Sequence, residues 1–290
     1  MMEDYPEKVH FKLKKRARKG IPDSYRGAAW KALTCCRQLR EENPSINYYS
    51  LLKIKASKKD VDYIFKDISR TFPKHEYFED AYGKGQKTLF NVLKNLALVN
   101  KDTGYVQGMG YITAILLMYM DEEDAFWTMI SILSKFGLKK YYLPSMPGLL
   151  EAFYVLQQLI KDKLPKVHEF LKKNKMSPSM YATQWFMTIF TVGFNFDCTV
   201  RAFDAFFAEG PKIIYRIALY ILKQNETKLT QDKVEISDFF AIMSDYNKNL
   251  NPDDLIQGAS KIDITRKQIV MYEKEYEEGP DEEILKLACV

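Results

Sequence analysis

The sequence predicts an all-α fold with essentially no sheet, and three observations support this. Segments whose apolar residues recur at helical spacing follow one another along the 290 residues. No run shows sustained alternation of apolar and polar residues between hairpin turns, as half-buried strands would. Apolar residues make up 47% of the chain, and its 13 glycines and 11 prolines are scattered. A substantial core is therefore expected throughout.

The length exceeds the usual size of one domain, so we expect one large domain or two closely packed halves. The run from Tyr141 to Pro147 contains two prolines and two tyrosines and is the expected junction. On this interpretation residues 1–19 form a basic N-terminal arm and residues 20–290 form the main domain. Its N-terminal half spans about 20–145 and its C-terminal half about 146–290.

The positive charge of the chain is local. The net charge is +5, yet residues 8–19 contain seven basic side chains and no acid: Lys8, Lys12, Lys14, Lys15, Arg16, Arg18 and Lys19. The simpler interpretation is a solvated, partly helical arm. A peripheral contact with an anionic membrane, or with nucleic acid, is the alternative. A nucleic-acid partner is not expected, because no clear aromatic pattern is interleaved with these charges.

Cysteine usage and hydropathy indicate the cellular compartment in which the protein is expected. The four cysteines, at positions 35, 36, 198 and 289, suggest neither a zinc site nor a regular framework of disulfides. No apolar signal segment is seen at the N-terminus, and the longest apolar run, Tyr111 to Met120, is far shorter than the roughly 20 residues that cross a bilayer. We therefore expect a soluble protein in the reducing cytoplasm.

The first helix after the basic arm is predicted to start at Gly20-Ile21-Pro22, with Asp23 or Ser24 as its cap, and to run through Leu33. Arg26 and Trp30 lie at i and i+4 on one face, so the guanidinium could stack on the indole. Taken alone, this pair indicates a structural helix start.

The next well-marked helix begins at Asp60 and carries apolar residues at helical spacing, with Ile64 and Ile68 among them. Pro73 biases Phe72 away from helical dihedrals, so this helix should stop near Arg70 to Phe72. An arginine there is favoured by the helix dipole and can pair with Asp67, an exposed interaction worth only ~0.2 to 0.5 kcal/mol. By itself Arg70 is an ordinary helix-end charge.

A further helix is predicted from Leu89 to Val99, entered by a loop from Gly83 to Thr88. This loop lacks the spacing and the preceding strand of a phosphate-binding loop. A turn then leads into Tyr105-Val106-Gln107-Gly108 and the apolar run, which predicts a helix buried on all sides. Gln107 would sit at or near its start, where backbone amides favour anions, and Gly108 leaves room for another backbone.

The rest of the chain continues in helices. Acids from Asp121 to Asp124 should open a helix that ends before Gly137. The aromatic-rich segment 181–196 is interpreted as core, and Arg201 with Asp204 as a structural ion pair. The other predicted helices are Leu149–Leu164, Ile213–Leu222, Ile236–Met243, Leu255–Ala259 and the charged, peripheral Ile269–Tyr276.

The residues suited to chemistry are few. Three histidines lie far apart without metal-binding or serine-triad contexts, and no metal site is indicated. What remains is an arginine and a glutamine, neither of which is a general base near neutral pH. Both suit phosphoryl transfer, in which negative charge spreads over the transferred group and a water must be positioned.

Three motifs in order resemble the fingerprints of the TBC domain family, activators of Rab-type small GTPases. They are Gly20-Ile-Pro-x-x-x-Arg26-x-x-x-Trp30, Ile64-x-x-Asp67-x-x-Arg70 followed by Thr71-Phe72-Pro73, and Tyr105-x-Gln107-Gly108. The likeness covers about 20–222 and extends toward residue 259, so it spans a whole domain.

The resemblance implies a V-shaped helical domain of two halves that straddle a Rab-family GTPase in its GTP-bound state. Arg70 would be an arginine finger and Gln107 would replace the GTPase's own glutamine. Asp67, Tyr105, Gly108, Arg26 and Trp30 would support the fingers or contact the partner. Such a chain is an activator in trans and not itself an enzyme.

It would need no cofactor of its own, because GTP and Mg²⁺ belong to the GTPase. It would act in vesicle trafficking, in the cytoplasm or at the periphery of endomembranes. The alternative is a non-catalytic helical scaffold or effector that binds a trafficking GTPase.

Overall fold

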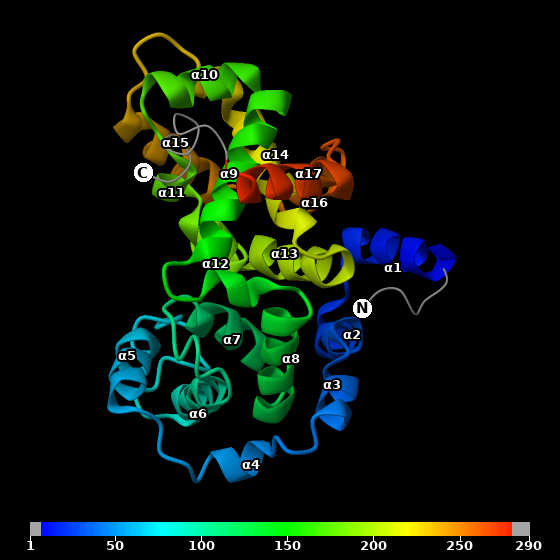
Figure 1. The fold of residues 1–290 in the computed structure, drawn as a ribbon, viewed down its shortest axis with the longest axis vertical. Helices are drawn as coiled ribbons and strands as arrows, with labels where there is room; N and C mark the ends of the chain where they lie inside the picture. Colours follow the sequence, from blue (N-terminus) through cyan, green and yellow to red (C-terminus); the bar gives the residue numbers. More distant parts are fainter. Residues whose placement is uncertain (1–6, 280–290) are drawn as a thin grey trace. The chain divides into compact units, whose positions relative to one another are not determined.

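The structure, a computed structural model, describes residues 7–279. Within that range the chain forms seventeen α-helices and one 3-10 helix and no strand (Figure 1), which confirms the all-α prediction. The helices fall into two compact units. One unit holds residues 21–145, and the other holds residues 146–279 together with residues 7–20.

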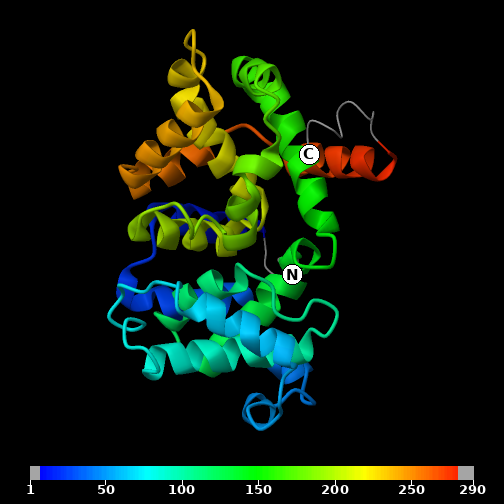
Figure 2. The same ribbon diagram turned by 90° about the vertical axis from the view of Figure 1, so that its left-hand side faces the viewer.

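The first unit is built around α7 (Met109–Leu117), which packs against α5, α6 and α8. Every residue of α7 except Tyr111 is buried, as expected of a helix that is apolar on all sides. In Figures 1 and 2, α5 lies beside α6. The other elements of this unit are α2 (Asp23–Thr34), α3 (Cys36–Glu42), α4 (Tyr48–Leu51), α5 (Lys58–Ile68), α6 (Lys84–Val99), α8 (Glu122–Ser134) and η1 (Leu138–Tyr141).

Only some helices of this unit start with the side-chain cap that the local sequence predicts. Asp121 caps α8 by accepting a hydrogen bond from the Asp124 backbone N–H at 3.0 Å, as its position before the acidic run predicts. The predicted cap of α2 is wrong. Helix α2 begins at Asp23 after Pro22 without a side-chain cap, because the Asp23 carboxylate bonds the Arg26 guanidinium and the Tyr119 hydroxyl instead.

Two boundaries also differ from the predictions. The segment from Gly83 to Thr88 was expected to be a loop, but only Gly83 is outside the helix, as its N-cap residue, and Lys84 to Thr88 form the first part of α6. Gln86 donates a hydrogen bond to the Phe78 carbonyl at 2.9 Å, so a tertiary contact outweighs the low helix propensity of glycine here. Helix α5 ends at Ile68, before Arg70, and Phe72 adopts a positive φ of 47° rather than an extended conformation.

The second unit is centred on α13 (Phe196–Glu209) and α14 (Lys212–Leu229), each with eleven buried residues. The aromatic-rich segment before α13 is core, as predicted, with Trp185, Phe186 and Phe190 all buried. The other helices of this unit are α1 (Glu7–Lys19), α9 (Pro147–Lys163), α10 (Pro165–Lys173), α11 (Pro178–Tyr181), α12 (Thr183–Thr188), α15 (Ile236–Lys248), α16 (Pro252–Ser260) and α17 (Arg266–Glu277).

The basic segment 7–19 is a helix attached to this unit, where the sequence suggested a solvated arm. Helix α1 packs against α13, and Arg18 makes two hydrogen bonds to the Glu209 carboxylate, at 2.7 and 2.8 Å. Arg201 donates to the backbone carbonyls of Ala17 and Arg18, at 3.1 and 2.8 Å. The predicted Arg201–Asp204 ion pair is present at 3.9 Å.

The C-terminal helices were predicted correctly but too short, and α3, α4, α10, α11 and α12 were not predicted. Helix α17 is held on α9 by the Tyr154 hydroxyl, which donates to Glu275 at 2.8 Å. No helix within residues 7–279 has the length and apolar character to cross a bilayer. Cys35, Cys36 and Cys198 are free thiols, and Cys289 lies outside the described residues.

Candidate functional site

The candidate site begins at the end of α5. This helix is capped by Ser57, whose hydroxyl accepts from the Asp60 backbone N–H at 3.0 Å. Its inner face buries Ile64, Asp67 and Ile68. The apolar positions orient the helix, and the same orientation carries a carboxylate into the interior of the unit.

A tight turn after α5 sets the place of Arg70. The Asp67 carbonyl accepts from the Arg70 backbone N–H at 3.1 Å and from the Thr71 hydroxyl at 2.7 Å. Thr71 is buried, so the turn is anchored from the inside. The Arg70 side chain points outward with 46% of its surface exposed, and its guanidinium pairs with the Asp67 carboxylate.

Tyr105 occupies the other oxygen of that carboxylate. Its hydroxyl donates to Asp67 Oδ2, while the Arg70 guanidinium donates to Oδ1. Burial, and then the hydrogen bond to Asp67, raise the pKa of the Tyr105 hydroxyl well above its ordinary value, so the phenol stays a donor at neutral pH. Asp67 is thus buried and held on both oxygens, which fixes the direction in which it presents Arg70.

The structure adds a residue that the sequence analysis missed. Asp60 Oδ1 accepts a hydrogen bond from the Tyr105 backbone N–H at 2.9 Å. Asp60 and Asp67 are seven residues apart, two turns of one helix, and therefore lie on the same face. Helix α5 consequently holds Tyr105 twice, by its backbone and by its hydroxyl.

The residue at position 104, next to the Tyr105–Asp60 hydrogen bond, has to be a glycine. Gly104 has a φ of +61°, and a Cβ on it would come within 2.8 Å of Asp60 Oδ1. The spacing of two acids on a predicted helix was the available sequence signal for Asp60, but nothing local indicated that its partner lies forty-five residues away.

Gln107 is placed by the same loop. Gly108, with a φ of +107°, is the N-cap residue of α7, so Gln107 immediately precedes the cap. Its side chain is exposed and has no hydrogen bond to any residue in the described range 7–279. The Cα atoms of Tyr105 and Gln107 are within about 7 Å of each other, because consecutive Cα atoms lie about 3.8 Å apart. The residue that carries the exposed carboxamide is therefore only two positions from the tyrosine that binds Asp67.

Arg26 and Trp30 belong to a different cluster. The Arg26 guanidinium lies over the ring of Tyr119, with its Cζ 5.3 Å from the centroid, and donates to the Ile21 carbonyl at 2.9 Å. Trp30 is fully buried and meets Tyr119 edge to face. Tyr119 follows the C-terminal end of α7, whereas Gln107 precedes its N-terminal end. Their burial supports a structural role rather than contact with a partner.

The Asp67–Tyr105 hydrogen bond makes a testable prediction about stability. Replacing Tyr105 with phenylalanine is expected to lower the free energy of unfolding by about 1.5 to 3 kcal/mol, because a buried carboxylate loses one of its two partners. Urea denaturation measures the effect. Tyr111→Phe is the matched control, since that hydroxyl has no hydrogen bond within residues 7–279. Equal midpoints for the two variants would contradict the role assigned to Tyr105.

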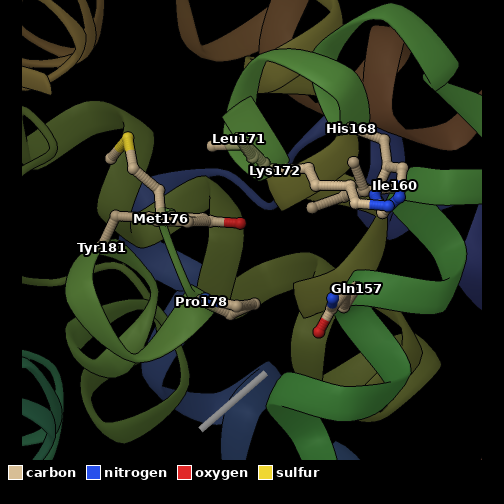
Figure 3. A pocket seen from close by; sticks show the side chains of 8 residues that line it. All are labelled: Gln157, Ile160, His168, Leu171, Lys172, Met176, Pro178 and Tyr181. Carbon is tan, nitrogen blue, oxygen red and sulfur yellow. The ribbon is translucent and has the colours of Figure 1, made fainter. Parts of the chain in front are cut away.

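The second unit contains a small cavity that is not a nucleotide site. It lies between α9, α10 and α11, and its lining includes Gln157, His168 and Tyr181 (Figure 3). Its volume of about 10 Å³ has room for about one water molecule. Burial, followed by the nearby Lys161 and Lys172 cations, lowers the pKa of His168. A space of this size cannot hold a phosphate group.

Comparison with known proteins matches most of the chain to a family. A family model described as the Rab-GTPase-TBC domain matches residues 23–230. This range contains the α5 turn and the loop from Tyr105 to Gly108.

Among curated relatives, the chain is 33% identical to the human "Ecotropic viral integration site 5 protein homolog" over 275 residues, 94% of this chain and 33% of that protein. It is 32% identical to the "Rab GTPase-activating protein tbc-11" of Caenorhabditis elegans over 262 residues, 89% of this chain and 28% of that protein. The chain thus spans a third or less of these two relatives.

Among solved structures, the Chlamydomonas flagellar RabGAP TBC domain aligns with a TM-score of 0.76 at 25% identity. The alignment covers 87% of this chain and 84% of that chain.

Proposed function

The chain belongs to the Rab-GTPase-TBC domain family, and on that premise we propose that it accelerates GTP hydrolysis by a Rab-type small GTPase in its GTP-bound state. Arg70 and Gln107 act in trans, and GTP and Mg²⁺ are contributed by the GTPase. The observation that carries the proposal is the half-exposed Arg70 guanidinium, clamped by a buried Asp67 beside a loop that presents an unbonded glutamine.

The chemistry of hydrolysis explains why these two side chains suffice. Negative charge spreads over the γ-phosphoryl oxygens in the transition state, and a guanidinium stabilises it with a fixed fork of donors. The attacking water needs orientation more than deprotonation, and a carboxamide can both donate to it and accept from it. The activator therefore supplies positioning and charge while the partner supplies the substrate.

The contacts around Asp67 support catalysis by preorganisation. An arginine on a free loop would lose conformational freedom on entering the GTPase, which would weaken its effect on the rate. The Asp67 carboxylate is held by Tyr105 and restrains the guanidinium before the GTPase arrives. Because the same tyrosine begins the Tyr105-x-Gln107 loop, one buried contact serves both residues.

A single-turnover phosphate-release assay over a panel of GTP-loaded Rab proteins tests the proposal. We expect strong acceleration on at least one member. Binding to a GTP-loaded Rab without acceleration of any member would instead identify the chain as a non-catalytic effector or scaffold. The absence of acceleration across a complete panel would remove the activator function.

Asp60 gives a further prediction that concerns positioning. Asp60→Ala removes the acceptor for the Tyr105 N–H and is expected to reduce the stimulated rate about tenfold, because a hydrogen bond to a charged group contributes on the order of 1.5 to 3 kcal/mol. Asp60→Asn keeps an oxygen acceptor and should recover most of the rate. The exposed Asp62 of the same helix provides the control variant, Asp62→Ala.

A double-mutant cycle separates positioning from general stability. If Asp60 acts through the loop that carries Gln107, Asp60→Ala should cost little additional rate in a Gln107→Ala background. A full tenfold loss in both backgrounds would show that Asp60 acts independently of the glutamine.

A further inference from the structure

The outward surface of α1 is a continuous cationic stripe. Lys12, Lys15, Arg16 and Lys19 are all exposed and stand at i, i+3, i+4 and i+7. At 3.6 residues per turn these positions span an arc of about 100° on one side of a helix. Ala17, which is buried, lies on the opposite side. We call the four exposed cations the α1 stripe.

The α1 stripe carries uncompensated charge. Residues 12–19 contain no acid, and the four side chains form no ion pair or hydrogen bond with any residue of the described range. Arg18, by contrast, pairs with the buried Glu209 carboxylate. The charge of the stripe is therefore available to an external partner.

The positive surface extends from α1 to the start of α14. Glu209, itself only 2% exposed at its side chain, pairs with both Arg18 and Arg216. Burial, and then the neighbouring Arg216, lower the pKa of Lys212. The cations of Lys14 and Arg18 lower it further. Asp263 also acts on Arg216. Two carboxylates, Glu209 and Asp263, thus lie among four cations, Lys14, Arg18, Lys212 and Arg216, which leaves a net positive charge beside the stripe.

The stripe is presented rigidly. Arg201 bonds two consecutive carbonyls near the C-terminal end of α1, at Ala17 and Arg18, and also bonds Asp253 of α16 at 2.8 Å. These contacts, with the Arg18–Glu209 pair, attach the helix to α13 and α16 by its inner side. Because α1 is already ordered, an external partner can bind its outer side without the loss of conformational entropy that ordering a segment would require.

We propose that the α1 stripe docks the domain electrostatically on an anionic lipid surface. The four charges lie side by side along a stretch of about 10 Å, as seven residues of helix rise, and can face a plane of headgroups together. Leu13, 39% exposed at the edge of the stripe, is an apolar side chain of the kind that enters the interfacial region. From residue 12 to residue 19, helix α1 has no aromatic side chain on which bases could stack.

The contribution of the α1 stripe to membrane affinity is expected to be large enough to measure. Each lysine or arginine near an anionic membrane strengthens binding about fivefold, so four together contribute on the order of 10³-fold. Because exposed charges are screened over about 8 Å at physiological ionic strength, the attraction should weaken strongly as salt is raised. This inference is independent of GTP hydrolysis.

Vesicle co-sedimentation of the full chain tests the proposal without any GTPase. The vesicles are phosphatidylcholine with and without phosphatidylserine, at physiological and at high ionic strength. The test variant replaces Lys12, Lys15, Arg16 and Lys19 with glutamine. The matched control replaces four exposed lysines of the first unit, Lys53, Lys55, Lys58 and Lys59, and changes the net charge equally.

We expect the parent chain and the control to sediment with phosphatidylserine vesicles only, and the α1 variant to bind by two to three orders of magnitude more weakly with unchanged circular dichroism. Equal losses in both variants would assign the effect to net charge and overturn the proposal. So would a parent chain that fails to sediment, or one that binds a nucleic-acid duplex in a parallel filter assay but not the vesicles.

Discussion

Replacing Arg70 with alanine is expected to lower the stimulated rate of GTP hydrolysis by about 10³- to 10⁵-fold, the range that an arginine finger contributes in GTPase systems. This corresponds to about 4 to 7 kcal/mol of activation free energy. In the isolated chain Arg70 pairs with a carboxylate that is itself buried, so losing this partner is expected to lower the free energy of unfolding by about 1 to 3 kcal/mol. The expected effect on the rate is therefore larger than the expected effect on folding, and urea denaturation of the variant measures the second effect separately.

Two further variants separate charge from geometry at this position. Arg70→Lys keeps a cation beside the buried Asp67 but loses the planar fork that binds phosphoryl oxygens in pairs, so its stability should stay near that of the parent while most of the acceleration is lost. Lys66→Ala removes another exposed cation of α5 and should leave the rate unchanged. If Arg70→Ala retained the parent rate, the assigned role of this arginine would be wrong.

Replacing Gln107 with alanine is expected to reduce the stimulated rate by about 10²- to 10³-fold. This is the usual loss when one preorganised hydrogen-bonding group is removed from a transition state. The unfolding midpoint should not move, because the side chain is exposed and unbonded within the described residues. A large kinetic effect without a stability effect is what distinguishes a catalytic group from a structural one.

The source of the catalytic glutamine can be tested in the partner. With a Rab variant whose own active-site glutamine is replaced, the parent chain should still accelerate hydrolysis, and Gln107→Ala should abolish the acceleration. Gln257→Ala, which removes an exposed glutamine of α16, serves as the control. Full activity of Gln107→Ala on an unmodified Rab would eliminate the two-residue mechanism but leave the role of Arg70 intact.

Much of the helical architecture could be predicted because its signals are local. The spacing of Ile64 and Ile68 predicted α5, and the acids at Asp121 to Asp124 marked the start of α8. The errors lie where a tertiary contact overrides a local preference. Lys84 to Thr88 is helical, and its Gln86 side chain bonds the Phe78 carbonyl. Asp23 fails to cap α2 because its carboxylate bonds Arg26 and Tyr119.

The sequence by itself determined the all-α class, most of the long helices, the order of the motifs and the choice of Arg70 and Gln107 as candidate residues. Periodicity and capping act over one or two helical turns, so they are legible in a single segment. Only the tertiary structure decided that Asp60 and Asp67 both hold Tyr105, across 45 and 38 residues of chain. It also decided that Arg26 and Trp30 support the far end of α7. Such contacts depend on how whole helices pack against one another, which is set by the burial of apolar faces and not by the local identity of the polar residues.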